Sequence, residues 1–334
     1  MKAVQVPEAG EEFEVIEKDV PEPEGEEVRV AVEACGICHS DVFVKEGQFP
    51  GIDYPRTPGH EVVGRVDAVG ESVDAWEEGQ RVGVGWHGGH CFECEPCRRG
   101  DFIACENSEV TGIAYDGGYA EYMTAPQEAI AAVPDDLDAS AAAPLMCAGI
   151  TTYNALRNSD AKPGDLVAVQ GVGGLGHLGI QYAHAAGFET VAVSRGTEKR
   201  DLALDLGADH YVDSEAENPG EALQELGGAR VVLATAPNAG AIESVVSGLG
   251  VSGEVLAVGI PGEPVGVSIQ ELVMGRRSVG GWPSGDARDS QDTLEFSALR
   301  EIEPMIETYP LEDAGEAYER MLANDARFRV VLEP

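Results

Sequence analysis

Four cysteines lie close together in the chain, and their spacing suits metal coordination. The run CFECEPCRRGDFIAC places them in the pattern C-x2-C-x2-C-x7-C, as Cys91, Cys94, Cys97 and Cys105. Four thiolates complete a tetrahedral shell, and zinc is the metal that such closed sites usually hold. A segment this short and polar has little apolar surface to bury. The metal would therefore supply much of its folding free energy, about 10–16 kcal/mol in comparable zinc peptides. The sequence predicts a structural Zn²⁺ site.

A disulfide pair and an iron–sulfur cluster are the two alternatives for these cysteines. Thiols this crowded pair poorly as disulfides, and nothing in the sequence indicates export to an oxidising compartment. The opening MKAVQVPEAG lacks the apolar core of a signal peptide, and no later stretch approaches ~18–20 unbroken apolar residues. The sequence favours a soluble, cytoplasmic, zinc-binding protein.

A glycine-rich run carries the second chemical motif. Residues Gly171, Val172, Gly173, Gly174, Leu175 and Gly176 form G-x-G-x-x-G after the apolar run LVAVQ and open a helical stretch. The glycines allow a tight turn and close approach of a pyrophosphate, while the helix N-terminus attracts phosphate groups. A second apolar run, TVAVS, follows about twenty residues later, as a dinucleotide-binding βαβ unit requires. The sequence predicts a dinucleotide site here.

The end of that second predicted strand indicates which dinucleotide binds. An Asp or Glu there would bind the ribose 2′-hydroxyl of NAD, but this chain has Ser194 and Arg195, with Lys199 and Arg200 a turn later. Arg195 can stack on adenine and pair with a 2′-phosphate, Ser194 can donate a hydrogen bond, and Lys199 adds a positive charge. Basic residues are otherwise scarce in the chain. The pattern predicts NADP(H) as the cofactor.

The elements that must position these motifs fall into two groups. Residues 1 to about 145 alternate short β-rich runs (VRVAVEACG, EVVGRVDAVG, RVGVGW) with turns, which indicates a mostly antiparallel β domain. From about residue 150, six apolar strand candidates alternate with helical segments, which indicates a parallel doubly wound sheet. The tail from residue 295 is expected to form helices and a closing strand that returns to the first domain.

The net charge of the chain is strongly negative. Its 60 acidic residues against 22 basic ones give −38, and they are spread along the chain. This charge disfavours nucleic acid and anionic membranes as partners. Two interpretations remain, a surface adapted to molar salt and an acidic face that recruits a basic partner. The first is favoured, because ~1 M salt shortens the Debye length to 3 Å and screens self-repulsion. It points to a halophile with a salt-loaded cytoplasm.

Together these motifs resemble the zinc-dependent medium-chain alcohol dehydrogenases, and Ser-Arg-x-x-x-Lys resembles their NADP-dependent, cinnamyl-type branch. CHSD, GHE, the four-cysteine lobe, GVGGLG and GWPSG occur in the family's order over essentially the whole chain. The resemblance implies an α/β fold class, a Rossmann doubly wound parallel sheet plus a β-rich GroES-like catalytic domain with a structural zinc lobe. The implied domains are a catalytic domain at residues 1–150 with the lobe at 90–106, an NADP-binding domain at 151–283, and the C-terminal part of the catalytic domain at 284–334.

The resemblance also implies a second, open zinc site, which gives two Zn²⁺ per chain. Its ligands would be Cys38, His60 and Cys147, which leaves a fourth position for water or a substrate oxygen. Glu61 matches the family's carboxylate that can coordinate when the substrate position is empty. Asp41 matches the acid that orients the ligand histidine, although it could instead be a turn or cap residue.

Three further residues match family positions near the reacting groups. Ser40 stands where a hydroxyl accepts the proton of the alcohol, and His39 stands near the cofactor pyrophosphate. Thr151 stands where a hydroxyl supports the nicotinamide, although it too could be a cap residue. One position departs from the pattern, because many relatives carry a relay histidine where this chain has Phe43. The proton would then leave through His39 or through ordered water.

The resemblance implies reversible hydride transfer between an alcohol or aldehyde and NADP(H). An apolar primary alcohol or aldehyde is favoured, because aromatic residues fall at or near the pocket-lining positions, namely Phe43, Phe49, Trp86 and Trp282. Sugar or polyol dehydrogenases are the alternative. A non-catalytic NADPH-binding relative is another, which the joint presence of Cys38, His60 and Cys147 argues against. A homodimer or homotetramer is expected, because these states dominate the family.

Overall fold

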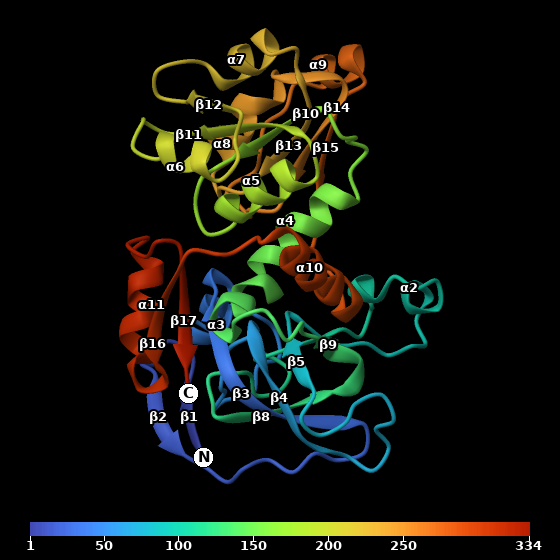
Figure 1. The fold of residues 1–334 in the computed structure, drawn as a ribbon, viewed down its shortest axis with the longest axis vertical. Helices are drawn as coiled ribbons and strands as arrows, with labels where there is room; N and C mark the ends of the chain where they lie inside the picture. The colour runs from blue at the N-terminus through green and yellow to red at the C-terminus, as the bar shows by residue number, and fades with distance from the viewer. The chain divides into compact units, whose positions relative to one another are not determined.

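Strands and helices gather into two separate units in the computed structural model of the protein, which describes residues 1–334 (Figure 1). One unit comprises residues 1–150 and 285–334, and the other comprises residues 151–284. Helix α4 (Ala148–Arg157) runs from the first unit into the second. None of the helices combines the length and apolar character needed to cross a bilayer.

A seven-stranded sheet organises the first unit. Polar and apolar residues alternate along β3 (Glu27–Ile37), so that Val28, Val30 and Val32 are buried on one face. The strand order is β16-β17-β3-β4-β5-β9, with β8 also paired to β3. The pairings are antiparallel except for the parallel pair β16–β17, which agrees with the predicted β domain. The other strands are β4 (Val62–Val69), β5 (Arg81–Val84), β8 (Tyr122–Pro126), β9 (Ile130–Ala132), β16 (Ile306–Pro310) and β17 (Arg329–Glu333).

Short elements surround this sheet. Two small ladders are formed by β1 (Lys2–Gln5) with β2 (Glu14–Glu17) and by β6 (His87–Gly89) with β7 (Glu109–Val110). The helices of the unit are α1 (Val42–Lys45), α2 (Glu95–Arg98), α3 (Ala139–Ala142), α10 (Ala287–Arg300) and α11 (Ala314–Leu322). The C-terminal strand lies in the same sheet, where β17 pairs with β3 and brings Val330 opposite Ile37.

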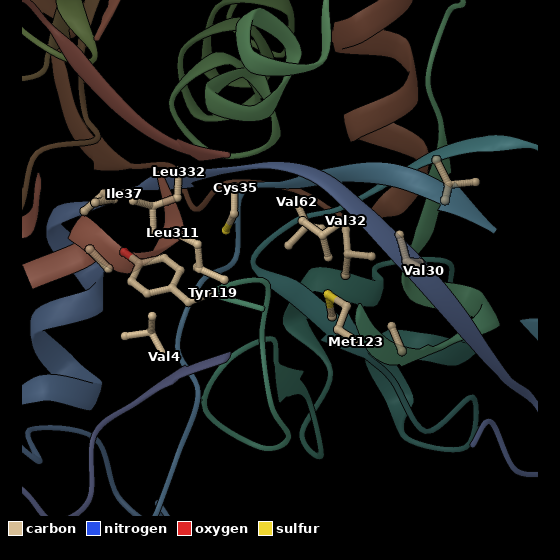
Figure 2. Packing of buried hydrophobic residues seen from close by; sticks show 14 of the residues in the cluster. Val4, Val30, Val32, Cys35, Ile37, Val62, Tyr119, Met123, Leu311 and Leu332 are labelled. Atoms are coloured by element: carbon tan, nitrogen blue, oxygen red, sulfur yellow. The ribbon is translucent and has the colours of Figure 1, made fainter. Parts of the chain in front are cut away.

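The core of the first unit lies where segments distant in sequence meet. Figure 2 shows Val4, Tyr119 and Leu311 packed together close to Leu332 of β17. All four side chains are almost fully buried. This packing fixes β3 and the segment after it, which carries the chemistry-bearing residues Cys38 to Asp41.

A six-stranded parallel sheet organises the second unit, as the apolar runs predicted. Its order is β12-β11-β10-β13-β14-β15, which is the Rossmann order 3-2-1-4-5-6. The strands are β10 (Leu166–Gln170), β11 (Glu189–Ser194), β12 (His210–Asp213), β13 (Ala229–Ala234), β14 (Leu249–Ala257) and β15 (Ser278–Gly281). The intervening helices are α5 (Gly176–Ala185), α6 (Arg200–Asp205), α7 (Pro219–Glu225), α8 (Ala239–Val246) and α9 (Ile269–Gly275).

Candidate active site and metal centres

Four side chains from three separate segments converge in the first unit. Cys38 follows β3, His60 and Glu61 precede β4, and Cys147 precedes α4. One ligand atom from each lies within 4.8 Å of those of the other three, and the two sulfur atoms are 3.8 Å apart. The hydrogen bond with Cys147 lowers the pKa of the Cys38 thiol well below its usual value. Burial acts in the opposite direction, but the nearby His60 lowers the same pKa further. The cluster thus favours one thiolate even before an ion adds its charge.

A capping box fixes the segment that carries Cys38. Asp41 accepts a hydrogen bond at Oδ2 from the backbone N–H of Cys38 at 2.8 Å, and Cys38 Sγ accepts one from the backbone N–H of Ser40 at 3.5 Å. This reciprocal pairing turns the chain sharply after β3. Ser40 is half-buried and His39 is exposed in the resulting turn.

Asp41 also sets the orientation of His60. Its Oδ1 lies 3.2 Å from His60 Nδ1, and both side chains are almost completely buried. A ring that donates from Nδ1 presents the lone pair of Nε2. His60 Nε2 is buried with no hydrogen-bond partner, and so is Glu61 Oε2.

A bound cation would provide a partner for both His60 Nε2 and Glu61 Oε2. Buried polar atoms are rarely left without a partner, and here two of them belong to a group of two thiols, an imidazole and a carboxylate. Sulfur and nitrogen ligands with a carboxylate suit Zn²⁺. The donor set of Cys38, His60, Glu61 and Cys147 therefore fits zinc.

The four-cysteine lobe forms a second cluster of possible ligands. One sulfur from each of Cys91, Cys94, Cys97 and Cys105 lies within 4.8 Å of the others, and none of the protein's cysteines forms a disulfide. Backbone N–H groups of Cys91 and Asn107 donate to Cys105 Sγ at 3.4 and 3.3 Å. The side-chain amide of Asn107 lowers the pKa of Cys91 to about 6, with further help from backbone N–H groups. Burial, in contrast, raises the pKa of Cys97 to about 12, so the lobe without a metal favours a thiolate at Cys91 but not at Cys97.

Aromatic side chains gather beside His60. The rings of Phe43, Phe49 and Trp86 lie 6.2–6.5 Å from one another, and the Trp86 ring lies 4.9 Å from the His60 ring. They pack against Val44, Val110 and other apolar residues. The structure thus brings together three of the four predicted pocket residues. Trp282 belongs to the other unit, where its backbone N–H donates to Ala257.

The glycine-rich turn joins β10 to α5 in the second unit. Gly171 has a φ of +98°, which favours glycine, and a Cβ at Gly176 would lie 1.8 Å from the Gly171 carbonyl oxygen. A Cβ at Gly173 would meet nothing within 4 Å, so this side of the turn is open. The half-buried Gly174 and Leu175 complete the turn. The predicted strand, tight turn and helix are all present, with open space where a pyrophosphate could approach.

The segment after β11 holds the residues expected at a 2′-phosphate. Ser194 is half-buried and Arg195 is exposed. Lys199 Nζ donates to the Val172 carbonyl at 2.7 Å, which links this segment to the glycine-rich turn. Gly196 is held by β12, because its N–H donates to Asp213 at 2.8 Å and its carbonyl accepts from Tyr211 at 2.7 Å. Thr151, half-buried in α4, belongs to the same unit.

Comparison with known proteins agrees with this arrangement. Residues 24–135 match the alcohol dehydrogenase GroES-like domain family, and residues 174–299 match the zinc-binding dehydrogenase family. The chain is 45% identical over 312 residues to alcohol dehydrogenase patD of Penicillium expansum, over 93% of this chain and 91% of that protein. It is 40% identical over 335 residues to an alcohol dehydrogenase of Geobacillus stearothermophilus, over 100% and 99%. The chain belongs to the zinc-dependent medium-chain alcohol dehydrogenases.

The solved structures support the same assignment. The structure of CAD from Helicobacter pylori complexed with NADP(H) superposes with a TM-score of 0.87 and 27% identity, covering 99% of this chain and 97% of that one. For this zinc-dependent alcohol dehydrogenase, the predicted fold class, a GroES-like domain plus a Rossmann sheet, is confirmed.

One residue of this dehydrogenase that the sequence analysis missed is Arg329. It is the first residue of β17, and the pairing of β17 with β3 brings it next to the Cys38 segment. Its Nη2 donates to Glu61 Oε1 and, at 3.1 Å, to the Ile37 carbonyl. Burial raises the pKa of Glu61 to about 7 although Arg329 opposes it. The second arginine of RFRVVLE was the only signal in the sequence, and it does not identify a partner.

A second missed residue is Tyr119, in the segment before β8. Its side chain is fully buried, and its hydroxyl donates to Asp41 Oδ2 at 2.9 Å. Asp41 lies 78 positions earlier in the sequence, so no local pattern connects the two residues. The hydroxyl adds a contact behind the Asp41–His60 pair.

Proposed function

We propose that the protein is an NADP-dependent zinc alcohol dehydrogenase, which interconverts an apolar primary alcohol and its aldehyde. The observation that carries this proposal is the cluster of Cys38, His60, Glu61 and Cys147 next to aromatic rings in the same unit. A zinc ion held there would supply Lewis-acid polarisation of the substrate oxygen. The four-cysteine lobe would hold a second, structural zinc.

The chain's own residues would orient the substrate and move its proton. Phe43, Phe49 and Trp86 offer an apolar wall, which suits an aliphatic or aromatic chain better than a polyol. Ser40 Oγ would accept the proton of the alcohol while its own hydroxyl proton passes to the exposed His39, which would release a proton to solvent. Phe43 takes no part in this relay, because a phenyl ring cannot accept or donate a proton, and its ring packs in the aromatic cluster instead.

Metal analysis and a substrate panel test this function. We expect two zinc ions per chain and oxidation of NADPH with apolar aldehydes, faster than with ketose sugars of similar size. Polyols and sugars as the best substrates would contradict the apolar pocket. Two zinc ions without turnover on any member of the panel would favour a non-catalytic NADPH-binding protein.

The cofactor preference is proposed from Ser194, Arg195 and Lys199, at and just after the end of β11. The end of β11 lacks the carboxylate with which an NAD enzyme would bind the ribose 2′-hydroxyl, and this supports a preference for NADP(H). Solved structures that are 27% identical to this chain include one complexed with NADP(H) and an NAD-dependent alcohol dehydrogenase, so the residues after β11 carry the proposal. In this proposal Arg195 contacts the 2′-phosphate, while Lys199 keeps the segment close to the glycine-rich turn.

Replacing Ser194 with Asp and Arg195 with Leu should reduce the preference for NADP(H). Charge-assisted hydrogen bonds contribute about 1.5–3 kcal/mol, which corresponds to roughly 10- to 100-fold in kcat/KM with NADPH. The rate with NADH should change much less, because that cofactor lacks the 2′-phosphate. Arg230→Leu is the matched control, since Arg230 lies at the start of β13, at the other end of the sheet from the glycine-rich turn, and pairs with Asp160. Equal kcat/KM for NADPH and NADH in the unmodified enzyme would contradict the proposal.

A homodimer or homotetramer in a salt-rich cytoplasm completes the proposal. All four residues of the edge strand β15 are exposed, and the neighbouring α9 exposes Ile269, Val273 and Met274. Exposed strand edges and apolar patches are surfaces that proteins usually cover, here with a second copy of the chain. With a net charge of −38, assembly should need salt. Light scattering that reports a monomer at ~2 M salt, where screening is strong, would contradict this.

A further inference from the structure

The carboxylate of Asp41 is held from three directions. Its Oδ2 accepts the backbone N–H of Cys38 at 2.8 Å and the Tyr119 hydroxyl at 2.9 Å, and its Oδ1 faces His60 Nδ1 at 3.2 Å. The Cys38 bond belongs to the capping box and the His60 bond to the candidate metal site. Only the Tyr119 contact comes from a segment with no ligand of its own.

The backbone around Tyr119 is built to place its hydroxyl at Asp41. Its N–H donates to the Pro58 carbonyl at 3.0 Å, and its carbonyl accepts from Val4 at 2.7 Å. Gly59, which directly precedes His60, makes room for the ring, because a Cβ at that position would lie 2.5 Å from Tyr119 Cδ1. Tyr119 is therefore packed under the same turn that presents His60.

Packing leaves the Tyr119 side chain little freedom. Figure 2 shows its ring among Val4, Leu311 and Cys35, and the side chain has no exposed surface. Burial raises the pKa of the Tyr119 hydroxyl, and Asp41 acts in the same direction, so the hydroxyl keeps its proton and remains a donor. Because the Tyr119 hydroxyl is held in place and donates to Asp41, it restricts the rotation of the Asp41 carboxylate.

We propose that Tyr119 is a positioning residue of the metal site, whose hydroxyl holds Asp41 in the orientation that directs His60 Nε2 to zinc. This inference rests on the proposed zinc site at Cys38, His60 and Cys147. Contacts behind metal-ligating histidines typically change metal affinity by about 10- to 100-fold when they are removed. Tyr119 contacts His60 only through Asp41. Removing the Tyr119 hydroxyl should therefore weaken metal binding by no more than removing the Asp41 carboxylate does.

The test is the rate at which the purified enzyme loses zinc to a chelator. In Tyr119→Phe, which keeps the ring and removes only the hydroxyl, we expect one of the two zinc ions to dissociate roughly 10-fold faster. The zinc of the four-cysteine lobe should dissociate at the unmodified rate and serves as the internal reference. Substitution of cobalt into the faster site should give a visible spectrum that changes in the variant, because the imidazole ligand is held less firmly.

Two further variants separate positioning from packing. Tyr318 is buried in the same core, and its hydroxyl has no hydrogen-bond partner, so Tyr318→Phe should leave both dissociation rates unchanged. Asp41→Asn should accelerate loss from the same site by at least as much as Tyr119→Phe. Adding Tyr119→Phe to Asp41→Asn should then produce little further change, since the hydroxyl acts through the carboxylate.

Three results would overturn the inference. They are unchanged zinc loss in Tyr119→Phe when Asp41→Asn accelerates it, equal acceleration at both metal sites, and full additivity of the two substitutions. If the unmodified enzyme holds only the zinc of the lobe, the proposed metal site itself is refuted. Counting zinc in the unmodified enzyme first therefore distinguishes the two failures.

Discussion

Replacing Cys147 with serine is expected to abolish turnover while the four-cysteine lobe keeps its zinc. Cys147 contributes one of two sulfur atoms in the candidate catalytic cluster, 3.8 Å from Cys38 Sγ. A serine hydroxyl is a poor ligand for zinc compared with a thiolate. Lewis-acid polarisation is worth several kcal/mol, so kcat should fall on the order of 10³-fold or more. Metal analysis should find one zinc per chain instead of two.

Two other cysteines provide controls for this experiment. Cys35 is fully buried and belongs to neither candidate metal cluster, so Cys35→Ala should keep both zinc ions and most of the activity. Cys94→Ser should remove the zinc of the lobe and reduce thermal stability more than it reduces the rate of the remaining folded enzyme. Normal turnover and two zinc ions in Cys147→Ser would show that the catalytic cluster is assigned wrongly.

The elements that sequence alone predicts well are those whose signals are local. The four sulfur atoms of the lobe come from a single run of the chain, so their spacing was enough to bring them together. The apolar runs of the second unit predicted six parallel strands, because buried parallel strands are nearly continuous in apolar residues, as in LVAVQ of β10. The G-x-G-x-x-G turn was likewise contained between one strand and one helix.

Contacts that depend on strand register could not be predicted in this way. Arg329 and Glu61 are 268 positions apart, and they meet only because β17 pairs with β3 in one register. A shift of one residue would turn Arg329 to the opposite face of the sheet. Lys199 could be predicted in part. Its charge was evident from the sequence, but its hydrogen bond to the Val172 carbonyl depends on how two turns approach each other.

The buried pair of Arg329 and Glu61 should make a large contribution to the stability of the first unit. Both side chains are at least nine-tenths buried, and Arg329 Nη2 contacts Glu61 Oε1 and the Ile37 carbonyl. At a pH above the Glu61 pKa of about 7, removing Arg329 leaves the carboxylate charge uncompensated in the interior. Arg329→Met is therefore expected to reduce the free energy of unfolding by about 3–5 kcal/mol, measured by chemical denaturation at fixed salt and zinc.

A neutral partner should restore part of this loss. In the double variant Arg329→Met with Glu61→Gln, neither member of the pair is charged, so the double variant should be more stable than Arg329→Met alone. The coupling energy from the four proteins should then be well above the ~0.5 kcal/mol expected for independent sites. Surface ion pairs contribute less than ~1 kcal/mol, so Arg288→Met, which breaks the surface pair with Asp292 in α10, is the matched control. Additive effects in the cycle would mean that Arg329 acts through the Ile37 carbonyl alone, and that the charge of Glu61 is balanced by the metal rather than by the C-terminal strand.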